Sequence, residues 1–181
     1  QIKIINEDVL QIDETNLVKE KVTVFGNLPY NISTEILSKW IINLKSNFWF
    51  DCLVLMFQKE VADRIVAKTG SSKRSRISLI SELYTNPKLV LNISSGSFIP
   101  KPKVDSALIY FEILKKPRYK INQNRFKIIV DTAFNQKRKM IRSSLKNIFP
   151  NTKLALQKVG IEETKRPQNI DLKYFCDLSL I

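Results

Sequence analysis

The sequence feature that most constrains the fold is an alternation of short apolar runs with segments of helical periodicity. β-Strands are predicted at residues 2–5, 22–26, 52–57, 88–93 and 106–113. Helices are predicted between them at residues 35–44, 59–67 and 77–84. Strands that alternate with helices build α/β sheets, and only a loop joins the last two strands. We therefore expect an α/β sheet with an antiparallel strand or hairpin at one end.

The chain beyond residue 114 is predicted to be helical throughout. The predicted helices lie at residues 123–134, 137–148, 154–159 and 172–180. The predicted organisation is therefore a sheet domain over residues 1–114, a linker over 115–121 and a small all-α domain over 122–181.

Positive charge is concentrated in this helical region. The whole chain carries a net charge of +13, and residues 115–153 hold 12 basic side chains and one acidic one. In the helix predicted at 137–148, every fourth position is basic, which predicts a cationic row of Arg138, Arg142 and Lys146 opposite an apolar face. A localised basic patch indicates nucleic-acid binding more than contact with an anionic membrane surface. The plain alternative is a solvated, solubilising face.

The composition excludes several classes of site. There is no histidine, which removes His-based catalytic triads, His metal sites and the usual general base. Cys52 and Cys176 lie in apolar stretches without metal spacing, so neither a zinc site nor a disulfide scaffold is expected, and a reducing, cytoplasmic compartment fits. No run approaches the roughly 20 apolar residues that a membrane span needs. We therefore expect neither a metal nor a membrane partner.

The residues with the clearest chemistry follow the strand predicted at 22–26, in the order Asn27-Leu28-Pro29-Tyr30. Ligands of open α/β sheets bind beyond the carboxyl ends of strands. The Asn27 side-chain oxygen and the adjacent carbonyls are hydrogen-bond acceptors, proline stiffens the turn, and Tyr30 offers a flat face to a base. Such a site suits the exocyclic amino group of adenine, because two N–H···O bonds would free its lone pair to attack a methyl donor. The plain alternative is a strand-to-helix turn with a packing tyrosine.

The residues around this motif favour the chemical interpretation. The segment GNLPYNIST at 26–34 resembles, along its whole length, the signature of the rRNA adenine N6-methyltransferase superfamily. Further segments agree in order, namely FQKEV at 57–61, FIPKPKVDS at 98–106, AFNQKRKMIR at 133–142 and the late stretch at 160–170. Within the superfamily the chain is similar to the bacterial small-subunit rRNA adenine dimethyltransferases.

That resemblance implies a fold and an activity. The fold would be the C-terminal part of a Rossmann-like class I methyltransferase sheet domain, followed by a small helical RNA-binding domain. The activity would be dimethylation of the N6 of two adjacent adenosines in a hairpin loop of small-subunit rRNA, with S-adenosyl-L-methionine as cofactor, during ribosome assembly. The implied partners are that rRNA and the immature small ribosomal subunit, and the full-length protein is expected to be a monomer.

The resemblance also assigns roles to particular residues. Asn27 and the Leu28 carbonyl would accept hydrogen bonds from the target N6, Tyr30 would stack on the adenine, and Phe98 would flank it. Asp8 matches the acidic residue that contacts the adenine of the cofactor in this family, and Asn27 would also border the cofactor. RNA phosphates would be held by Arg138, Lys139, Arg142, Lys146, Lys73, Arg74 and Arg76. Taken alone, Asp8 would be a cap or turn residue, and Phe98 a loop anchor in the core.

The chain departs from the family pattern in its cofactor site. Its four glycines, Gly26, Gly70, Gly96 and Gly160, do not form the glycine-rich turn that holds the methionine part of the cofactor in the family. The sequence also offers no candidate for the acidic residue that would hold the ribose hydroxyls. Because the chain opens with Gln1 in a strand-like segment, we expect a fragment whose N-terminal cofactor motif is missing. We expect this chain alone to bind S-adenosyl-L-methionine poorly and to have little or no activity.

The residues leave two other functions open. An adenine N6-methyltransferase that acts on DNA or on large-subunit rRNA would use the same corner with a different nucleic acid. A non-catalytic RNA-binding assembly or transcription factor of the same fold would need the basic helix but not Asn27 or Tyr30. Replacement of Asn27 separates catalysis from binding, and the nature of the methylated nucleic acid separates the two enzymes.

Overall fold

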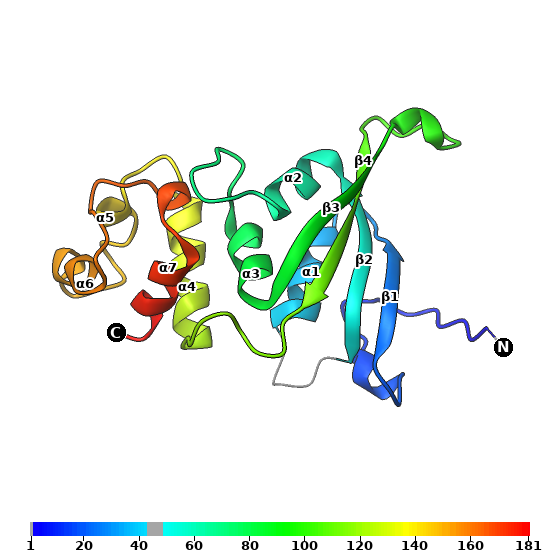
Figure 1. Cartoon of the computed structure of the whole chain (residues 1–181), viewed down its shortest axis with the longest axis horizontal. Helices are drawn as coiled ribbons and strands as arrows, with labels where there is room; N and C mark the ends of the chain where they lie inside the picture. The colour runs from blue at the N-terminus through cyan, green and yellow to red at the C-terminus, as the bar shows by residue number, and fades with distance from the viewer. Residues whose placement is uncertain (1, 43–48) are drawn as a thin grey trace. The chain divides into compact units, whose positions relative to one another are not determined.

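The computed structural model describes residues 2–42 and 49–181, and Figure 1 shows how its helices and strands are arranged. The described residues contain one four-stranded sheet with the strand order β1-β2-β4-β3. Its strands are β1 (Val22–Asn27), β2 (Phe50–Gln58), β3 (Thr85–Ile93) and β4 (Ser106–Ile113). β1 and β2 are parallel, whereas β4 is antiparallel to both β2 and β3. The predicted α/β sheet with an antiparallel hairpin at one end is confirmed.

The strand predicted at residues 2–5 is wrong. These residues have no regular secondary structure, and Ile2 and Ile4 are 94% and 88% exposed. A β-branched run becomes a strand only where a neighbouring strand satisfies its backbone N–H and C=O groups. Among the described strands β1, at the edge of the sheet, pairs with β2 alone. The run at 2–5 therefore stays irregular, because none of the described strands pairs with it.

The chain folds as two compact units. The first, here called the sheet unit, comprises Gln1–Ala62 and Thr85–Lys116, and the second, the helical unit, comprises Asp63–Tyr84 and Pro117–Ile181. The later boundary lies close to the predicted linker, but residues 63–84, which include α3 (Arg76–Tyr84), pack with the C-terminal helices. The division into a domain over 1–114 and a domain over 122–181 stays a prediction.

One face of the sheet forms the core of the sheet unit. Its buried side chains are Leu53, Leu55 and Phe57 on β2 and Ala107, Ile109 and Phe111 on β4. Helix α1 (Ser33–Ile42), which is drawn behind the sheet in Figure 1, buries Ile36, Leu37, Trp40 and Ile41. On the other face Phe25 is 76% exposed. Because side chains alternate along a strand, Asn27 shares the exposed face with Phe25, and Gly26 faces the core.

Local sequence signals set the helix ends of the helical unit. Besides α3, its helices are α4 (Gln123–Asn135), α5 (Ile141–Ser144), α6 (Thr152–Val159) and α7 (Leu172–Ser179). The side chains of Asn122 and Asn151 cap α4 and α6, because each accepts a backbone N–H three residues ahead, at 3.1 and 3.0 Å. Gly160, with a φ of 76°, ends α6 in the left-handed conformation that glycine adopts without strain. The rings of Phe134 and Phe175, 5.9 Å apart, join α4 to α7.

The helix predicted at 137–148 is wrong over most of its length. Only Ile141–Ser144 is helical, whereas Arg138 and Lys139 lie in the preceding turn and Lys146 in the following one. The backbone N–H of Ile141 donates to the Lys165 carbonyl at 2.7 Å, so contact with a distant segment replaces a regular helical hydrogen bond there. The cationic row along one helix face, predicted from the spacing, therefore does not form, although its residues remain exposed.

Candidate functional site

The corner after β1 places Asn27 at an open edge of the sheet. Asn27 is the last residue of β1 and pairs with Met56 of the parallel strand β2, so both strands end at this edge. A Cβ atom on Gly26 would lie 2.8 Å from Leu55 Cδ2 and 3.1 Å from Leu28 Cδ2. Glycine at this position thus lets Leu28 fold beneath the strand, where it is buried. The buried Leu28 side chain fixes the backbone on the core side of the sheet, while the Asn27 side chain stays exposed.

Tyr30 is fixed at its hydroxyl end and open along part of its ring. Its hydroxyl lies 2.6 Å from the Ser106 hydroxyl, and the two groups share a hydrogen bond. Its carbonyl accepts a hydrogen bond from the Ser33 hydroxyl at 3.1 Å, which ties the corner to the start of α1. The side chain is half-buried. An aromatic ring that is anchored at its tip and partly exposed is suited to stacking on a flat ligand.

Sequence reasoning missed two residues that connect this corner and the segments near it to β4, Asp105 and Ser106. Ser106 begins β4 and binds Tyr30, and the Asp105 carbonyl accepts the N–H of Lys59, where α2 (Lys59–Ile65) follows β2, at 2.9 Å. The Asp105 carboxylate accepts the N–H of Ser95, in the turn after β3, at 2.8 Å. The two residues are the last two of the FIPKPKVDS segment, which carries part of the family resemblance. Their place in that segment was the sequence signal that could have identified them.

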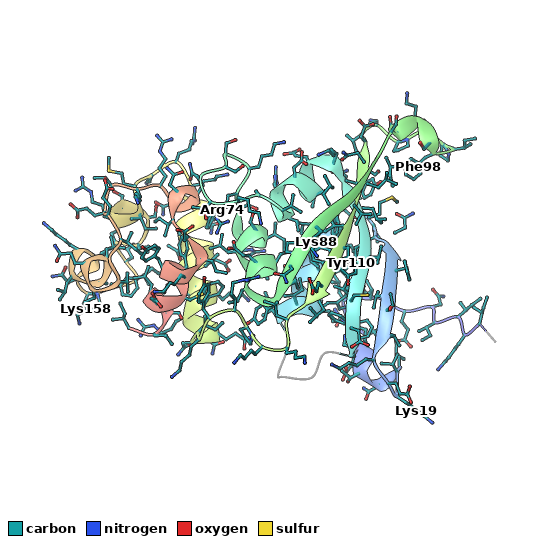
Figure 2. The ribbon with its side chains drawn as sticks, viewed as in Figure 1. Lys19, Arg74, Lys88, Phe98, Tyr110 and Lys158 are labelled. Carbon is teal, nitrogen blue, oxygen red and sulfur yellow. The ribbon has the colours of Figure 1, made fainter. Side chains whose placement is uncertain are left out.

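Phe98 lies at the tip of the β3–β4 hairpin, beyond the ends of both strands (Figure 2). It follows the short 3-10 helix η2 (Ser95–Ser97) and is half-buried, and its N–H donates to the Ser95 carbonyl at 3.4 Å. In the described part of the chain no ring contact or hydrogen bond joins Phe98 to Tyr30. The pairing of these two aromatic residues around one base stays a prediction.

Asp8 is an exposed turn residue. Its carboxylate accepts the N–H of Leu10 at 2.9 Å, and its carbonyl accepts the N–H of Gln11 at 2.9 Å. Among the described residues no partner is recorded for the second carboxylate oxygen of Asp8. That oxygen is therefore available to an amino donor, as a contact with adenine would require.

A shielded network around Lys39 holds the turn that carries Asp8. The Lys39 ammonium donates to the Val9 carbonyl at 2.7 Å and to the Glu14 carboxylate at 2.9 Å. The Trp40 indole N–H donates to the same carboxylate at 2.6 Å. The Lys39 and Glu14 side chains are only 18% and 12% exposed. No short motif marks this pair, because its members are 25 residues apart and meet only in the folded chain.

Arg74 does not lie on the surface, contrary to its predicted role as a phosphate contact. It is 1% exposed, its guanidinium binds the Glu82 carboxylate at 2.9 Å, and it donates to the Ala67 carbonyl at 3.2 Å. A buried cation with a carboxylate partner is a structural ion pair, and phosphate cannot reach it. The prediction of Arg74 as a phosphate contact is therefore wrong.

The other predicted RNA-binding residues are exposed. Ion pairs involve Lys73 with Asp63 at 2.8 Å, Arg76 with Asp131 at 3.0 Å and Arg142 with Glu163 at 3.3 Å. Exposed pairs of this kind contribute little stability, so a phosphate can displace the carboxylate at small cost. No ion pair is recorded among the described residues for Arg138, Lys139 and Lys146.

The two units differ sharply in charge. The helical unit contains 19 basic and 7 acidic residues, a net charge of +12, whereas the sheet unit contains 11 and 10, a net charge of +1. Relative to the predicted domain over 122–181, whose net charge is +7, residues 63–84 add a net charge of +3 and residues 117–121 add +2. Nearly all of the excess positive charge of the chain therefore lies in this unit.

Other features of the described residues carry no predicted site. A shallow hollow lies near the start of β1 and β2, at the end of these strands opposite Asn27, and is lined by Thr15, Val18, Lys19, Glu20, Lys21, Trp49 and Asp51. In residues 2–42 and 49–181 no group of three or more acidic or cysteine side chains is arranged to hold a metal ion. No helix described there is long and apolar enough to cross a membrane.

Comparison with solved structures defines the class of fold. The crystal structure of a dimethyladenosine transferase from Plasmodium falciparum superposes with a TM-score of 0.79 at 26% identity, covering 97% of this chain and 70% of that one. The sheet is therefore the Rossmann-like sheet of the methyltransferases. The family model for ribosomal RNA adenine dimethylase matches residues 1–181, and this chain belongs to that family.

Curated relatives agree with this assignment and with the resemblance found in the sequence. The chain is 48% identical over 172 residues to the ribosomal RNA small subunit methyltransferase A of Pelagibacter ubique (strain HTCC1062), covering 94% of this chain and 65% of that protein. It is 40% identical over 179 residues to the protein of the same name from Cereibacter sphaeroides (strain ATCC 17029), covering 99% and 64%. The chain thus spans just under two thirds of the length of these relatives.

Proposed function

We propose that this protein transfers methyl groups from S-adenosyl-L-methionine to the N6 of two adjacent adenosines in a hairpin loop of small-subunit rRNA, in the cytoplasm, on the immature small subunit. The observation that carries the proposal is the corner after β1: Asn27 is exposed at the carboxyl end of the strand and is followed by the anchored ring of Tyr30. Membership of the dimethylase family and the names of the relatives support the choice of substrate.

The corner supplies acceptors and a stacking surface. The Asn27 side-chain oxygen and the Leu28 carbonyl accept the two N–H groups of the adenine amino nitrogen. Two such bonds draw the nitrogen out of conjugation with the ring, so that its lone pair points at the methyl donor. The Tyr30 ring stacks on the base and limits the rotation of the base. The ring itself is held in place because the Tyr30 hydroxyl is bound to Ser106. These groups orient the nucleophile and need no histidine, which the chain lacks.

The residues present fit one end of the cofactor. S-adenosyl-L-methionine supplies, when bound, a methyl group on a positively charged sulfur. The free carboxylate oxygen of Asp8 would accept the amino group of its adenine, and Asn27 would border its reactive end. Lys39 holds the Asp8 turn in place. None of the four glycines forms a turn for the methionine part, so we propose weak cofactor binding by the 181-residue chain on its own.

RNA binding is proposed for the helical unit. Its exposed cations contact phosphates, which supplies affinity and leaves the choice of base to the corner. The residues proposed for this role are Lys73, Arg76, Arg138, Lys139, Arg142 and Lys146.

Asn27→Ala tests the proposal. We expect methyl incorporation into immature small subunits to fall at least about 100-fold, because an acceptor that acts in the transition state is lost. Asn92→Ala, the same change at an exposed position of β3, is the matched control and should leave incorporation unchanged. Radiolabelled cofactor gives the readout, with the 181-residue chain and the product of the complete gene assayed in parallel. Equal incorporation by N27A and N92A in an active protein would refute the role of the corner.

A further inference from the structure

The turn that carries Asp8, here called the Asp8 turn (residues 8–12), has little support of its own. The Asp8 carbonyl accepts the backbone N–H groups of Gln11 and Ile12 at 2.9 and 3.2 Å, which closes the turn. The preceding residues 2–7 are exposed and have no regular secondary structure. A short turn at the end of an exposed segment opens readily unless other parts of the protein hold it. The position of the free Asp8 carboxylate oxygen therefore depends on contacts from outside the turn.

Lys39 of α1 provides such contacts. Its ammonium donates to the carbonyls of Val9 and Ile12 and to the Glu14 carboxylate. An ammonium has three donors, so all of them are used here and none is left for a phosphate or for the cofactor. In the part of the chain that the structure describes, no side chain from another helix or strand is hydrogen-bonded to the backbone of the Asp8 turn besides that of Lys39.

The Glu14 carboxylate in turn fixes the Lys39 ammonium. One of its oxygens accepts both the Lys39 ammonium, at 2.9 Å, and the indole N–H of Trp40, at 2.6 Å. Trp40 is buried, and its ring packs edge-on against the Trp49 ring with the centroids 5.7 Å apart. Charge-assisted hydrogen bonds that are shielded from water are stronger than exposed ones. The ammonium is therefore held in one position.

The same helix begins at the target-base corner. The hydroxyl of Ser33, the first residue of α1, donates to the Tyr30 carbonyl at 3.1 Å. Lys39 follows six positions later, which at a rise of about 1.5 Å per residue is about 9 Å along the helix axis. Because the helical hydrogen bonds fix this spacing, α1 connects the corner and the Asp8 turn at a set distance.

We propose that Lys39, with its ion-pair partner Glu14, is a positioning residue for the adenine end of S-adenosyl-L-methionine, because it holds the Asp8 turn against α1. The proposal rests on the proposed function for the identity of the cofactor and for the contact between Asp8 and its adenine. A shielded ion pair thereby controls cofactor affinity through Asp8. Functional side chains keep a productive geometry when neighbouring groups lock them in place in this way.

A double-mutant cycle between Lys39 and Asp8 tests the proposal in the product of the complete gene. The probe is S-adenosyl-L-homocysteine, and the readout is its Kd from isothermal titration calorimetry. We expect Asp8→Ala to weaken binding about 10-fold, as loss of a hydrogen bond to a charged group does, and Lys39→Met about 5-fold, because a displaced turn keeps part of the contact. Since Lys39 acts through Asp8, the double variant should bind within about 2-fold of D8A. Independent effects, about 50-fold in the double variant, would overturn the proposal.

The matched control is Lys21→Met, which removes a lysine of the same unit from an exposed contact with Asp51, 3.9 Å away. It changes the net charge equally and should alter the Kd less than about 2-fold. Glu14→Gln is a second variant, which keeps the size of the side chain and removes the charge of the pair, and it should weaken binding about 3-fold. Equal weakening by K39M and K21M, or an unchanged Kd in E14Q, would overturn the proposal.

Hydrogen exchange in the 181-residue chain gives a readout that needs no cofactor. The N–H groups of Gln11 and Ile12, which are bonded within the Asp8 turn, should exchange about 10-fold faster in K39M than in K21M. The N–H groups of β2, which are bonded within the sheet, should exchange at the same rate in both variants. Unaltered exchange in the Asp8 turn would overturn the proposal, since the turn would then keep its conformation without Lys39.

The calorimetry also separates this proposal from the proposed function. If D8A left the Kd unchanged, the assignment of Asp8 to the cofactor would fail, and the role of Lys39 would fail with it. If D8A weakened binding and K39M and E14Q did not, the role of Lys39 alone would fail. Neither calorimetry nor hydrogen exchange depends on methyl transfer, so failure of the proposed chemistry at Asn27 is distinguished from both.

Discussion

The sheet unit and the helical unit present two different kinds of polar surface. The sheet unit is almost neutral, and its candidate site consists of uncharged acceptors and an aromatic ring held at a strand end by Ser106. The helical unit carries a net charge of +12, mostly as exposed cations on turns and short helices. The difference fits the proposed function, in which the sheet unit would discriminate the base and the helical unit would supply affinity for the RNA backbone.

The comparison also shows that charge on its own does not identify a contact residue. Arg74 and Lys73 are neighbours in sequence, yet Arg74 is 1% exposed, whereas the Lys73 side chain is 56% exposed. The first belongs to the interior of its unit and the second to its surface. Each of the following experiments changes one side of this comparison, in order of decreasing expected effect.

The largest effect is expected from Arg74→Met. Removal of the buried guanidinium breaks its hydrogen bonds to Glu82 and Ala67 and should lower the free energy of unfolding by about 2 kcal/mol, because the Glu82 side chain that is left is 36% exposed and stays partly solvated. Lys73→Met, which breaks only an exposed pair with Asp63, should cost less than about 0.5 kcal/mol. Urea denaturation measures both. If R74M weakened RNA binding more than K73M while remaining equally stable, Arg74 would belong to the contact surface after all.

A smaller effect is expected from Ser106→Ala. Loss of the hydrogen bond to the Tyr30 hydroxyl should cost about 1 kcal/mol of stability. Tyr30→Phe and the double variant complete a double-mutant cycle. The coupling free energy from this cycle measures the hydrogen bond between the Tyr30 and Ser106 hydroxyls. Methyl incorporation should fall in S106A, whereas RNA affinity should stay within about 2-fold, since phosphates dominate it. A loss of RNA affinity in S106A as large as the loss of methyl incorporation would contradict the separation of base recognition and backbone binding between the two units.

The smallest effect concerns one cysteine from each unit. Burial, and then the charge of Asp177, raise the pKa of the Cys176 thiol from 9.0 to about 12, whereas Cys52 is half-buried. The folded state thus holds the Cys176 proton above pH 9.0, where the unfolded state releases it. The neutral Cys176 thiol therefore contributes to the free energy of unfolding. This contribution is complete below pH 9.0 and is lost as the pH rises towards 12. A thiol reagent should label Cys52 first, and rapid labelling of Cys176 in the native protein would contradict its burial.

Much of the sheet was predictable because its signals are local. The strands predicted at 52–57 and 106–113 consist of apolar and β-branched runs of the right length for buried strands, and both lie within observed strands. The run at 2–5 has a similar composition and fails, because pairing with another strand cannot be read from the run itself. The end of β1 at Asn27 was predictable for the same local reason, since Pro29 cannot continue the strand.

What could not be predicted depends on contacts between distant residues. The spacing of Arg138, Arg142 and Lys146 fits a helix, but only Ile141–Ser144 is helical, and its first two backbone N–H groups donate to residues 163 and 165. The burial of Arg74 within a run of basic residues follows from Glu82 on α3, which no local pattern reveals. Lys39 and Glu14, Tyr30 and Ser106, and Lys137 and Ser72 are likewise pairs that only the fold brings together.

The dipeptide Asp105–Ser106 has one more consequence. Its two residues anchor the tyrosine corner, the turn before Phe98 and the start of α2. A slip of β4 by one residue would turn its side chains to the opposite face of the sheet and break all three hydrogen bonds at once. Molecules with a misaligned β4 would therefore lack these three hydrogen bonds, so the geometry of the corner depends on the correct register of β4.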